Sequence, residues 1–474
     1  MRRVWLSFVV LAALACGDDD GVARDGGSSD GGTFDGALDS AVDASQDAEP
    51  PVSDDGGEDA GDAGTDAGAV DRYDDVLAAF ETESSASALD ALLTDVGHVE
   101  GWPLVSGERW LFATRWDAVT GVAWVGDPNA WNPAANPARS APSGVHYFVE
   151  IVGIAAPRGA KYKWWSDGTF RAPPESTVYG EDEFGEHGYV APPTDVAFFE
   201  RFPGFAGEGV ASRTVRVRVP SDFAWERRVG SYATRPVRTL VLHDGQNVFL
   251  SGGAFGSWRV DQTLDADFAD VLAVAVDSSA DRFETYTPVV DDIGTGPVGG
   301  RGDAYVAFLE DEVLPFVRAR YRARAQGDSL AMAGSSLGGL VTLYTALARP
   351  SLARCAAGLS STLGWGAFER DGSGTLVRRW TDHGSTALYL DSGGGLSAGT
   401  CADRDADGVH EDSSDSDNYC VTLQLRDRLR ELGYVEGSDL FHYWEPGAPH
   451  SEAAWAARVG RFLSACTTGG WVAE

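Results

Sequence analysis

The residues best suited to chemistry stand in the pentapeptide Gly334-Ser335-Ser336-Leu337-Gly338, which has the form G-x-S-x-G. A run of small apolar residues precedes it at 329–333, and a helix-like run follows it at 339–344. A strand, a tight turn and a helix in this order raise a serine hydroxyl above the edge of a sheet. The glycines fit because such a turn is strained and the helix must pass close to the strand. The pattern predicts Ser336 as a nucleophile for acyl transfer.

A serine nucleophile needs a base, and the last of the eight histidines, His450, is the best candidate. It stands in a loop rich in Gly and Pro, between a strand-like run at 440–444 and a helix-like run at 453–463. A histidine in such a loop can reach a serine at the edge of the sheet. His442 lies within the strand-like run and is interpreted as structural.

The acid that orients the histidine should lie between the serine and the histidine, after the strand-like run at 386–390. Asp391 ends this run directly, whereas Asp417 stands just before a helix-like run. The residues between them look like an insertion pinched by two cysteines, and removing it would bring Asp417 back to the strand end. Asp417 is therefore the preferred acid, and Asp391 is the alternative.

The oxyanion of an acyl-transfer intermediate needs two backbone N–H donors. One should be Leu337, the residue after the nucleophile. The other should come from the loop His243-Asp244-Gly245-Gln246, which follows the strand-like residues 239–242. We expect Gln246 to be this second donor, with Gly245 as the alternative.

The elements that must position these residues alternate between strand-like and helix-like runs from about residue 197 onward. Residues 304–320, for example, are apolar at the spacing of one helix face. Such alternation implies an α/β fold with a mainly parallel sheet covered by helices on both faces. With a serine turn midway, the pattern is that of an α/β-hydrolase domain, which we assign to residues 193–474. The strand-like runs lie at 214–219, 239–242, 271–276, 330–333 and 386–390.

The beginning of the chain has the features of an exported lipoprotein. Residues 1–15 are typical of a signal peptide, with Arg2 and Arg3 before an apolar stretch that is too short to span a bilayer. The run Ala13-Leu14-Ala15-Cys16 resembles a bacterial lipobox, which implies a lipid on Cys16 and an outer-membrane or cell-surface location. Because the lipobox usually has Leu where Ala13 stands, cleavage by the ordinary signal peptidase is the alternative. That cleavage would give a periplasmic or secreted protein.

Residues 16–70 are predicted to form a disordered acidic tether. From 17 to 71 there are 17 acidic residues and one basic residue, in a chain whose net charge is −35. Few large apolar residues are available to offset chain entropy, so the segment should stay unfolded and extended. This acidity argues against nucleic acid or an anionic membrane surface as a partner, and a lipid anchor is the predicted contact with a membrane.

Residues 71–192 combine a helical lead-in with short alternating runs that are typical of a small β-sandwich. The run Gly126-Asp127-Pro128-Asn129-Ala130-Trp131 resembles the "G-D-F-N-x-W" turn of the immunoglobulin-like early-set domains, including the glycogen-binding-type carbohydrate module. The run Ala160-Lys161-Tyr162-Lys163-Trp164-Trp165-Ser166-Asp167-Gly168 resembles their "Y-K-F-x-x-D-G" strand. The resemblance implies that Trp131, Trp164 or Trp165 could stack on sugar rings. Packing of these rings in the core is the alternative.

Cysteine usage also indicates export. Four cysteines remain if Cys16 is lipidated, and an even number suggests two disulfides in an oxidising compartment. Of the three pairings we favour Cys401 with Cys420, which closes one loop, and Cys355 with Cys466, which ties the C-terminus to the sheet.

The insertion before Asp417 carries a calcium-like pattern. Asp403-Arg404-Asp405-Ala406-Asp407-Gly408 has the D-x-D-x-D-G form of a calcium loop. Glu411 occupies a later ligand position, but Ser414 stands where such loops carry a bidentate Glu. A structural calcium held by Asp403, Asp405 and Asp407 is one interpretation, and a solvated acidic loop is the other.

Several motifs together resemble the "Putative esterase" family, which includes enterochelin esterase, feruloyl and acetylxylan esterases, esterase D and mycolyl transferases. The resemblance implies a serine esterase that needs no organic cofactor, with the triad Ser336, Asp417 and His450. It also implies a substrate cleft near four further residues, His243, Trp258, Arg282 and Glu284. The motifs are His243-Asp244-Gly245-Gln246, Gly256-Ser257-Trp258, and residues 282–288, 334–339 and 447–452.

The sugar-module-like sandwich favours a carbohydrate-linked substrate, either a feruloyl or an acetyl ester. Enterochelin esterases have the same two-domain order, so a small-molecule siderophore ester is the alternative. That alternative would call for a basic cleft, of which this acidic chain gives little sign. Acyl transfer to an alcohol is a third option. From a different class, the chain could be a non-catalytic surface binding protein on a hydrolase scaffold.

Overall fold

The structure is a computed structural model. It describes residues 71–221, 223, 237–250, 255–292, 294, 296–367, 374–395, 401–410 and 417–473. The predicted signal peptide, the lipidation residue Cys16 and the predicted tether at 16–70 lie outside the described residues. In the described part of the chain, no helix combines the length and the apolar character needed to cross a membrane.

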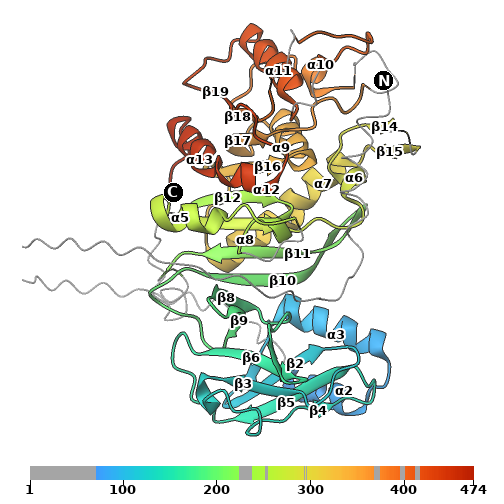
Figure 1. Cartoon of the computed structure of the whole chain (residues 1–474), viewed down its shortest axis with the longest axis vertical. Helices are drawn as coiled ribbons and strands as arrows, with labels where there is room; N and C mark the ends of the chain where they lie inside the picture. The colour runs from blue at the N-terminus through green and yellow to red at the C-terminus, as the bar shows by residue number, and fades with distance from the viewer. Residues whose placement is uncertain are drawn as a thin grey trace, which may run out of the picture. The chain divides into compact units, whose positions relative to one another are not determined.

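A large mixed sheet runs through the C-terminal part of the chain (Figure 1). Its strands there are β10 (Phe198–Gly207), β11 (Val210–Val219), β12 (Arg238–His243), β13 (Val271–Val276), β16 (Gly327–Ser335), β17 (Ala353–Leu359), β18 (Ala387–Ser392) and β19 (Leu440–Trp444). They are ordered β19-β18-β17-β16-β12-β13-β11-β10. The pairings from β19 to β13 are parallel, whereas β11 and β10 are antiparallel to their neighbours. The predicted mainly parallel sheet is therefore confirmed.

Helices cover both faces of this sheet (Figure 1). They are α5 (Val260–Asp267), α6 (Arg282–Thr285), α7 (Gly302–Phe308), α8 (Leu314–Tyr321), α9 (Leu337–Ala348), α10 (Leu376–Arg379), α11 (Tyr419–Glu431), α12 (Glu452–Ala456) and α13 (Val459–Thr468). Val241 of β12 packs in one apolar cluster with α7, α8, α9 and α11. Its neighbours Leu240 and Leu242 pack in the other cluster, with α5, α12 and α13. This division follows from the alternation of side chains along a strand.

Two smaller features complete this part of the fold. A π-helical turn η3 (Leu309–Val313) joins α7 to α8, so the predicted helix at 304–320 is made of three segments. A hairpin of β14 (Val290–Asp292) and β15 (Pro297–Gly299) follows α6.

The N-terminal part of the described chain forms two antiparallel sheets with an apolar core between them. Its elements are α2 (Tyr73–Thr82), α3 (Ala86–Val99), β1 (Leu104–Ser106), β2 (Arg109–Arg115), β3 (Ala123–Gly126), η1 (Asp127–Asn129), β4 (Arg139–Ser140), β5 (His146–Val152), β6 (Lys161–Ser166), β7 (Thr169–Arg171), β8 (Val178–Asp182) and β9 (Gly185–Tyr189). The first sheet has the order β1-β2-β5-β4, and the second contains β8, β9, β6, β3 and β7. The ring of Phe112 in the first sheet lies 5.0 Å from that of Trp124 and 5.1 Å from that of Tyr162 in the second. Helices α2 and α3 cover the opposite face of the first sheet, where Phe80 packs on Phe148.

The second of these sheets is continuous with the large sheet. Tyr179 of β8 pairs with Phe199 of β10, and Val178 pairs with Glu200. The hydrogen-bonded path of strands therefore crosses the predicted boundary at 192–193. A change in composition marks that boundary in the sequence, but strand pairing across it depends on contacts that composition does not reveal.

The three tryptophans proposed for sugar stacking lie in different surroundings. Trp164 is 1% exposed and packs in the core between the two sheets, so its predicted stacking role is wrong. Trp131 and Trp165 are partly exposed, and both meet the ring of Phe170 edge-on, at 6.0 and 4.9 Å. Phe170 is itself 47% exposed. These three rings form a surface aromatic cluster.

Both predicted disulfides are confirmed. Cys355–Cys466 joins β17 to α13 across a sequence separation of 111 residues, which ties the C-terminal helix to the sheet. Cys401–Cys420 spans 19 residues and joins the predicted insertion to the first turn of α11.

Candidate active site

Ser336 occupies a strained turn between β16 and α9. Its backbone has φ 55° and ψ −124°, a conformation that residues other than Gly rarely adopt. Backbone hydrogen bonds hold it there. The Ser336 N–H donates to the Leu359 carbonyl at 3.0 Å, and the Ser336 carbonyl accepts from the N–H groups of Leu340 at 3.0 Å and Thr362 at 3.1 Å. Strain of this kind persists only where the surroundings over-determine it, and it gathers at functional sites.

The glycines of the motif are required by close backbone packing. A Cβ at Gly334 would overlap the carbonyl group of Gly338, and a Cβ at Gly339 would overlap the hydroxyl of Ser361. Each overlap is with backbone or with a buried side chain, so the turn leaves no room for a larger residue. The pattern read from the sequence therefore has a steric cause.

His450 lies on the segment between β19 and α12, as predicted. Its Nδ1 is 2.5 Å from Oδ1 of Asp417, and its ring meets the ring of Trp455 edge-on at 4.8 Å. The imidazole is thus fixed on one side by a carboxylate and on one edge by an indole. About a third of its side chain (35%) stays exposed.

The structure brings Asp417, and not Asp391, to the histidine. The second oxygen of Asp417, Oδ2, accepts hydrogen bonds from the Gly393 N–H at 2.7 Å and the Ser360 hydroxyl at 2.6 Å. Asp391 is fully buried at the end of β18 and is paired instead with Arg458, whose Nε lies 3.0 Å from its Oδ2. Burial raises the pKa of Asp391 to about 6, and the neighbouring guanidinium works against this shift.

Ser336 and His450 are the candidate nucleophile and the candidate base. Within the part of the chain that the structure describes, no hydrogen bond links Ser336 to His450, and the Ser336 hydroxyl lies 3.3 Å from that of Thr362. Catalytic hydrogen bonds are often long without substrate and tighten in the reacting complex.

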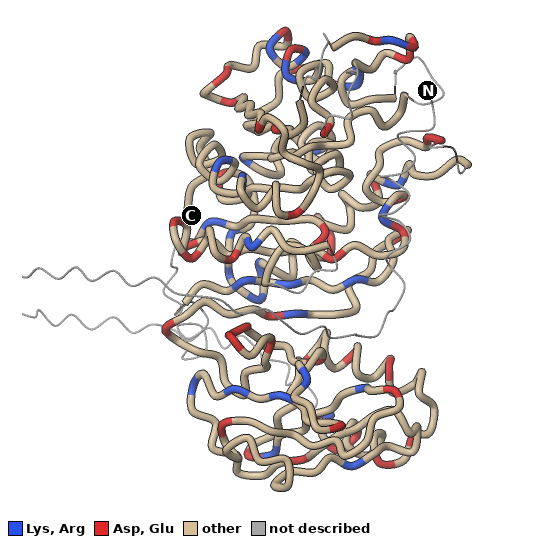
Figure 2. Tube along the Cα trace, viewed as in Figure 1, with Lys and Arg blue, Asp and Glu red and all other residues tan. Residues whose placement is uncertain are grey.

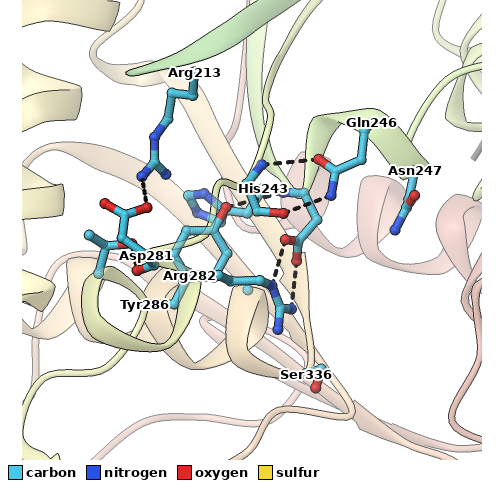
Figure 3. Close-up of polar contacts among 12 residues, drawn as sticks. Arg213, His243, Gln246, Asn247, Asp281, Arg282, Tyr286 and Ser336 are labelled. Atoms are coloured by element: carbon cyan, nitrogen blue, oxygen red, sulfur yellow. Dashed lines mark hydrogen bonds and ion pairs between the residues drawn. The ribbon is translucent and has the colours of Figure 1, made fainter. Parts of the chain in front are cut away.

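The loop after β12 packs directly against the serine turn. A Cβ at Gly338 would lie 3.2 Å from Oδ2 of Asp244 and 3.3 Å from Cβ of His243. Arg282 donates from Nε to Oδ1 of Asp244 at 2.7 Å and from Nη2 to Oδ2 at 2.8 Å. In Figure 3 the guanidinium of Arg282 lies on the side of the loop that faces Ser336. This bidentate pair fixes the loop beside the nucleophile.

The geometry leaves the two predicted oxyanion donors available. Two hydrogen bonds to Ser278 fix the side chain of Gln246 (Figure 3). Gln246 Nε2 donates to the Ser278 hydroxyl at 2.7 Å, and the Ser278 N–H donates to Gln246 Oε1 at 3.0 Å. Among the described residues, the backbone N–H groups of Leu337 and Gln246 donate to no backbone oxygen. Leu337 is the first residue of α9, where an N–H has no partner within the helix. Their role in binding an oxyanion stays a prediction.

The residues predicted to line the cleft are mostly buried behind it. His243 is 2% exposed, and its Nδ1 lies 2.9 Å from the hydroxyl of Tyr305. Trp258 is 3% exposed and packs 5.9 Å from Trp455, the residue that supports the catalytic histidine candidate. The prediction that these two side chains line the cleft is therefore corrected: both are buried, and they support the residues above them. Glu284 is partly buried on α6, and its carbonyl accepts the Arg301 N–H at 2.8 Å.

The three carboxylates of the predicted calcium loop do converge. Asp403, Asp405 and Asp407 each offer an oxygen within 4.8 Å of the others. Oxygens bound to Ca²⁺ lie at about 2.3–2.6 Å, so opposite ligands are about 5 Å apart and the spacing fits. Glu411 and Ser414 lie outside the described residues. Calcium binding stays a prediction.

Several contacts of the site were not foreseen from the sequence. On the loop after β17, Ser360 contacts Asp417 and Thr362 contacts Ser336. Arg458 lies behind Asp417 with its side chain 1% exposed. One signal in the sequence could have indicated Arg458. It stands among apolar residues of the helix-like run at 453–463, and a buried arginine there needs a buried partner.

The buried histidine behind the loop predicts a pH dependence of stability. Burial lowers the pKa of His243 to about 4, because the charged imidazolium is disfavoured away from water. The unfolded chain takes up this proton near pH 6.5, so stability present above that pH is lost as the pH falls toward 4. Between pH 7 and pH 4.5, the free energy of unfolding of the wild type should fall by about 2–3 kcal/mol more than that of His243→Gln. Denaturant unfolding at several pH values measures this, and equal slopes for both proteins would contradict it.

The chain is similar to several solved structures at low sequence identity. No curated protein matches the chain. Among solved structures, the enterobactin esterase from Shigella flexneri crystallised with enterobactin is similar at 14% identity, covering 81% of this chain and 98% of its own, with a TM-score of 0.41. A ferulic acid esterase is similar at 13% identity, covering 58% and 99%, with a TM-score of 0.41. A siderophore hydrolase from Aspergillus nidulans is similar at 19% identity, covering 58% and 95%, with a TM-score of 0.38.

The decisive comparison is with a family model. The model described as "Putative esterase" matches residues 211–457, more than half of the chain. The matched range contains β12, the serine turn, Asp417 and the loop of His450. The chain therefore belongs to the "Putative esterase" family and is a carboxylic ester hydrolase.

Proposed function

We propose that this esterase is an exported serine hydrolase in which Ser336 is the nucleophile, His450 the base and Asp417 the acid. The observation that carries the proposal is the pairing of His450 Nδ1 with Asp417 Oδ1 at 2.5 Å, in loops at the same sheet edge as the strained Ser336 turn. A carboxylate on Nδ1 leaves Nε2 to accept the serine proton. A triad of this kind needs no organic cofactor.

The reaction divides into two steps. In the first, Ser336 Oγ attacks the ester carbonyl, its proton passes to His450 Nε2, and the alcohol leaves with that proton. The N–H groups of Leu337 and Gln246 stabilise the oxyanion of the tetrahedral intermediate. In the second step a water molecule gives its proton to the histidine and hydrolyses the acyl-serine. The carboxylic acid leaves, and the serine regains its proton.

Replacement of the nucleophile tests the proposal. Ser336→Ala removes the attacking oxygen, so kcat/KM for p-nitrophenyl acetate should fall at least about a thousandfold. Steady-state hydrolysis measures this, with Ser335→Ala, the neighbouring serine at the end of β16, as the matched control that keeps most activity. Undiminished activity in Ser336→Ala would overturn the triad.

A second comparison separates the two acids. Asp417→Asn should lower kcat on the order of ten-thousandfold, because an amide no longer holds the histidine in the reactive tautomer. Asp391→Asn should act chiefly on stability, by about 3–5 kcal/mol, since it leaves Arg458 buried without its partner. Kinetics and denaturant unfolding of both variants provide the test. The opposite pattern, in which Asp391→Asn is inactive and Asp417→Asn active, would move the acid to Asp391.

We propose a carbohydrate-linked ester, feruloyl or acetyl, as the substrate class. The surface aromatic cluster of Trp131, Trp165 and Phe170 supports this, because exposed ring faces can pack against the apolar faces of sugars. The arginines of β11, by contrast, are each paired with an aspartate, so this basic strand offers little free charge for an anionic catecholate. In Figure 2 basic and acidic positions lie interspersed along the trace. The siderophore ester remains the alternative substrate.

Truncation of the aromatic cluster tests the substrate class. The double variant Trp165→Ala/Phe170→Ala should bind insoluble xylan or starch up to about tenfold more weakly while hydrolysing p-nitrophenyl acetate at the wild-type rate. Pull-down assays and a panel of feruloyl, acetyl-sugar and catecholate esters measure the two properties. Unchanged polysaccharide binding, or a preference for the catecholate triester, would contradict the carbohydrate assignment.

Two further proposals concern location and a metal. Export, with a lipid on Cys16 as the membrane anchor, is supported by the two disulfides, which form and persist in oxidising compartments. Structural calcium at Asp403, Asp405 and Asp407 is supported by the convergence of their carboxylates. It would brace the disulfide-closed insertion that leads into Asp417, and it takes no part in the chemistry.

A further inference from the structure

Ser360 is a second strained serine at this sheet edge. It follows β17 directly and has φ 46°, in the left-handed region. Its N–H donates to the Asp391 carbonyl at 2.9 Å, and its own carbonyl accepts from Asn418 Nδ2 at 2.8 Å. The residue is fully buried. A non-Gly residue held at positive φ by several partners points to a function.

The hydroxyl of Ser360 has its full set of hydrogen-bond partners. Trp455 Nε1 lies 3.0 Å from the oxygen, and so does Arg458 Nη2. Oδ2 of Asp417 lies 2.6 Å away. An indole N–H and a guanidinium can only donate, so they occupy the two acceptor positions of the oxygen. The one proton of the hydroxyl must therefore point to Asp417.

This direction fixes the orientation of Asp417. Its Oδ2 accepts hydrogen bonds from the Ser360 hydroxyl and the Gly393 N–H, and the two bonds hold this oxygen in place. Arg458 Nη2 lies 3.8 Å from the same oxygen. The other oxygen, Oδ1, is thereby turned toward Nδ1 of His450. A carboxylate oxygen accepts a hydrogen bond, so the geometry assigns the imidazole proton to Nδ1.

We infer that Ser360 is a positioning residue for the ester hydrolysis, because its hydroxyl, directed by Trp455 and Arg458, holds Asp417 in the orientation that fixes His450 in the Nδ1–H tautomer. The inference rests on the proposed triad. It also assigns a part to Asp391, whose carboxylate fixes the Nε of Arg458 at 3.0 Å and so aims the guanidinium at Ser360. The chain of contacts runs from Asp391 through Arg458 and Ser360 to Asp417.

Removal of this hydroxyl without backbone strain is the test. Ser360→Gly suits φ 46°, and Ser360→Ala does not, yet both lose the hydroxyl. Both should lower kcat for p-nitrophenyl acetate about ten- to hundredfold with little change in KM, since a hydrogen bond to a charged group is lost. Both should also shift or broaden the downfield proton resonance of His450 Nδ1–H. Ser392→Ala, which removes a buried hydroxyl that has no partner among the described residues, should change neither property.

The outcomes separate this inference from the triad itself. The resonance does not depend on turnover and can be identified by its loss in His450→Gln. A folded Ser360→Gly protein with wild-type kcat and an unchanged resonance would overturn the positioning role. Failure of Ser360→Gly to fold, with Ser392→Ala folded, would overturn it too, by making the hydroxyl a stability element. Full activity in Ser336→Ala would overturn the proposed triad instead.

Discussion

The proposed active site depends on one strained backbone position, Ser336 at φ 55° between β16 and α9. The strain lifts the hydroxyl above the sheet and places the first N–H of α9 beside it. It is maintained by backbone hydrogen bonds from the neighbouring strand β17 and the loop after it, at Leu359 and Thr362. Close packing around the turn excludes side chains at Gly334 and Gly339. The conformation of the nucleophile is therefore a property of two adjacent parallel strands and not of the pentapeptide alone.

The same pair of strands links Ser336 to Asp417. Parallel strands end at the same edge of a sheet, so the loops after β12, β17, β18 and β19 meet there. The loop after β17 carries both Ser360, bonded to Asp417, and Thr362, bonded to Ser336. The charges buried at this edge are paired, Arg458 with Asp391 and Arg282 with Asp244, because an unpaired charge in such surroundings is strongly destabilising. Two ion pairs therefore lie beside the two strained serines of the site, Ser336 and Ser360.

The sequence predicted the parallel sheet, the serine turn, the histidine loop and both disulfides, because each has a local pattern. From the sequence, Asp417 could be preferred over Asp391 only by treating the residues between them as an insertion. In the structure, Oδ1 of Asp417 lies 2.5 Å from Nδ1 of His450. The buried positions of Trp164, His243 and Trp258 were missed, since a motif does not tell which face of an element meets solvent. The contacts of Ser360 and Arg458 were missed because they join residues 98 positions apart in the chain.

Covalent labelling tests the central claim, that Ser336 is the activated nucleophile of this esterase, most directly. A fluorophosphonate forms a stable phosphonyl ester with a serine whose proton is taken by a neighbouring base. The account predicts one adduct per chain, located by peptide mass spectrometry at Ser336 and abolished in His450→Gln. Absence of an adduct on the folded wild-type protein, or an adduct on another residue, would contradict it.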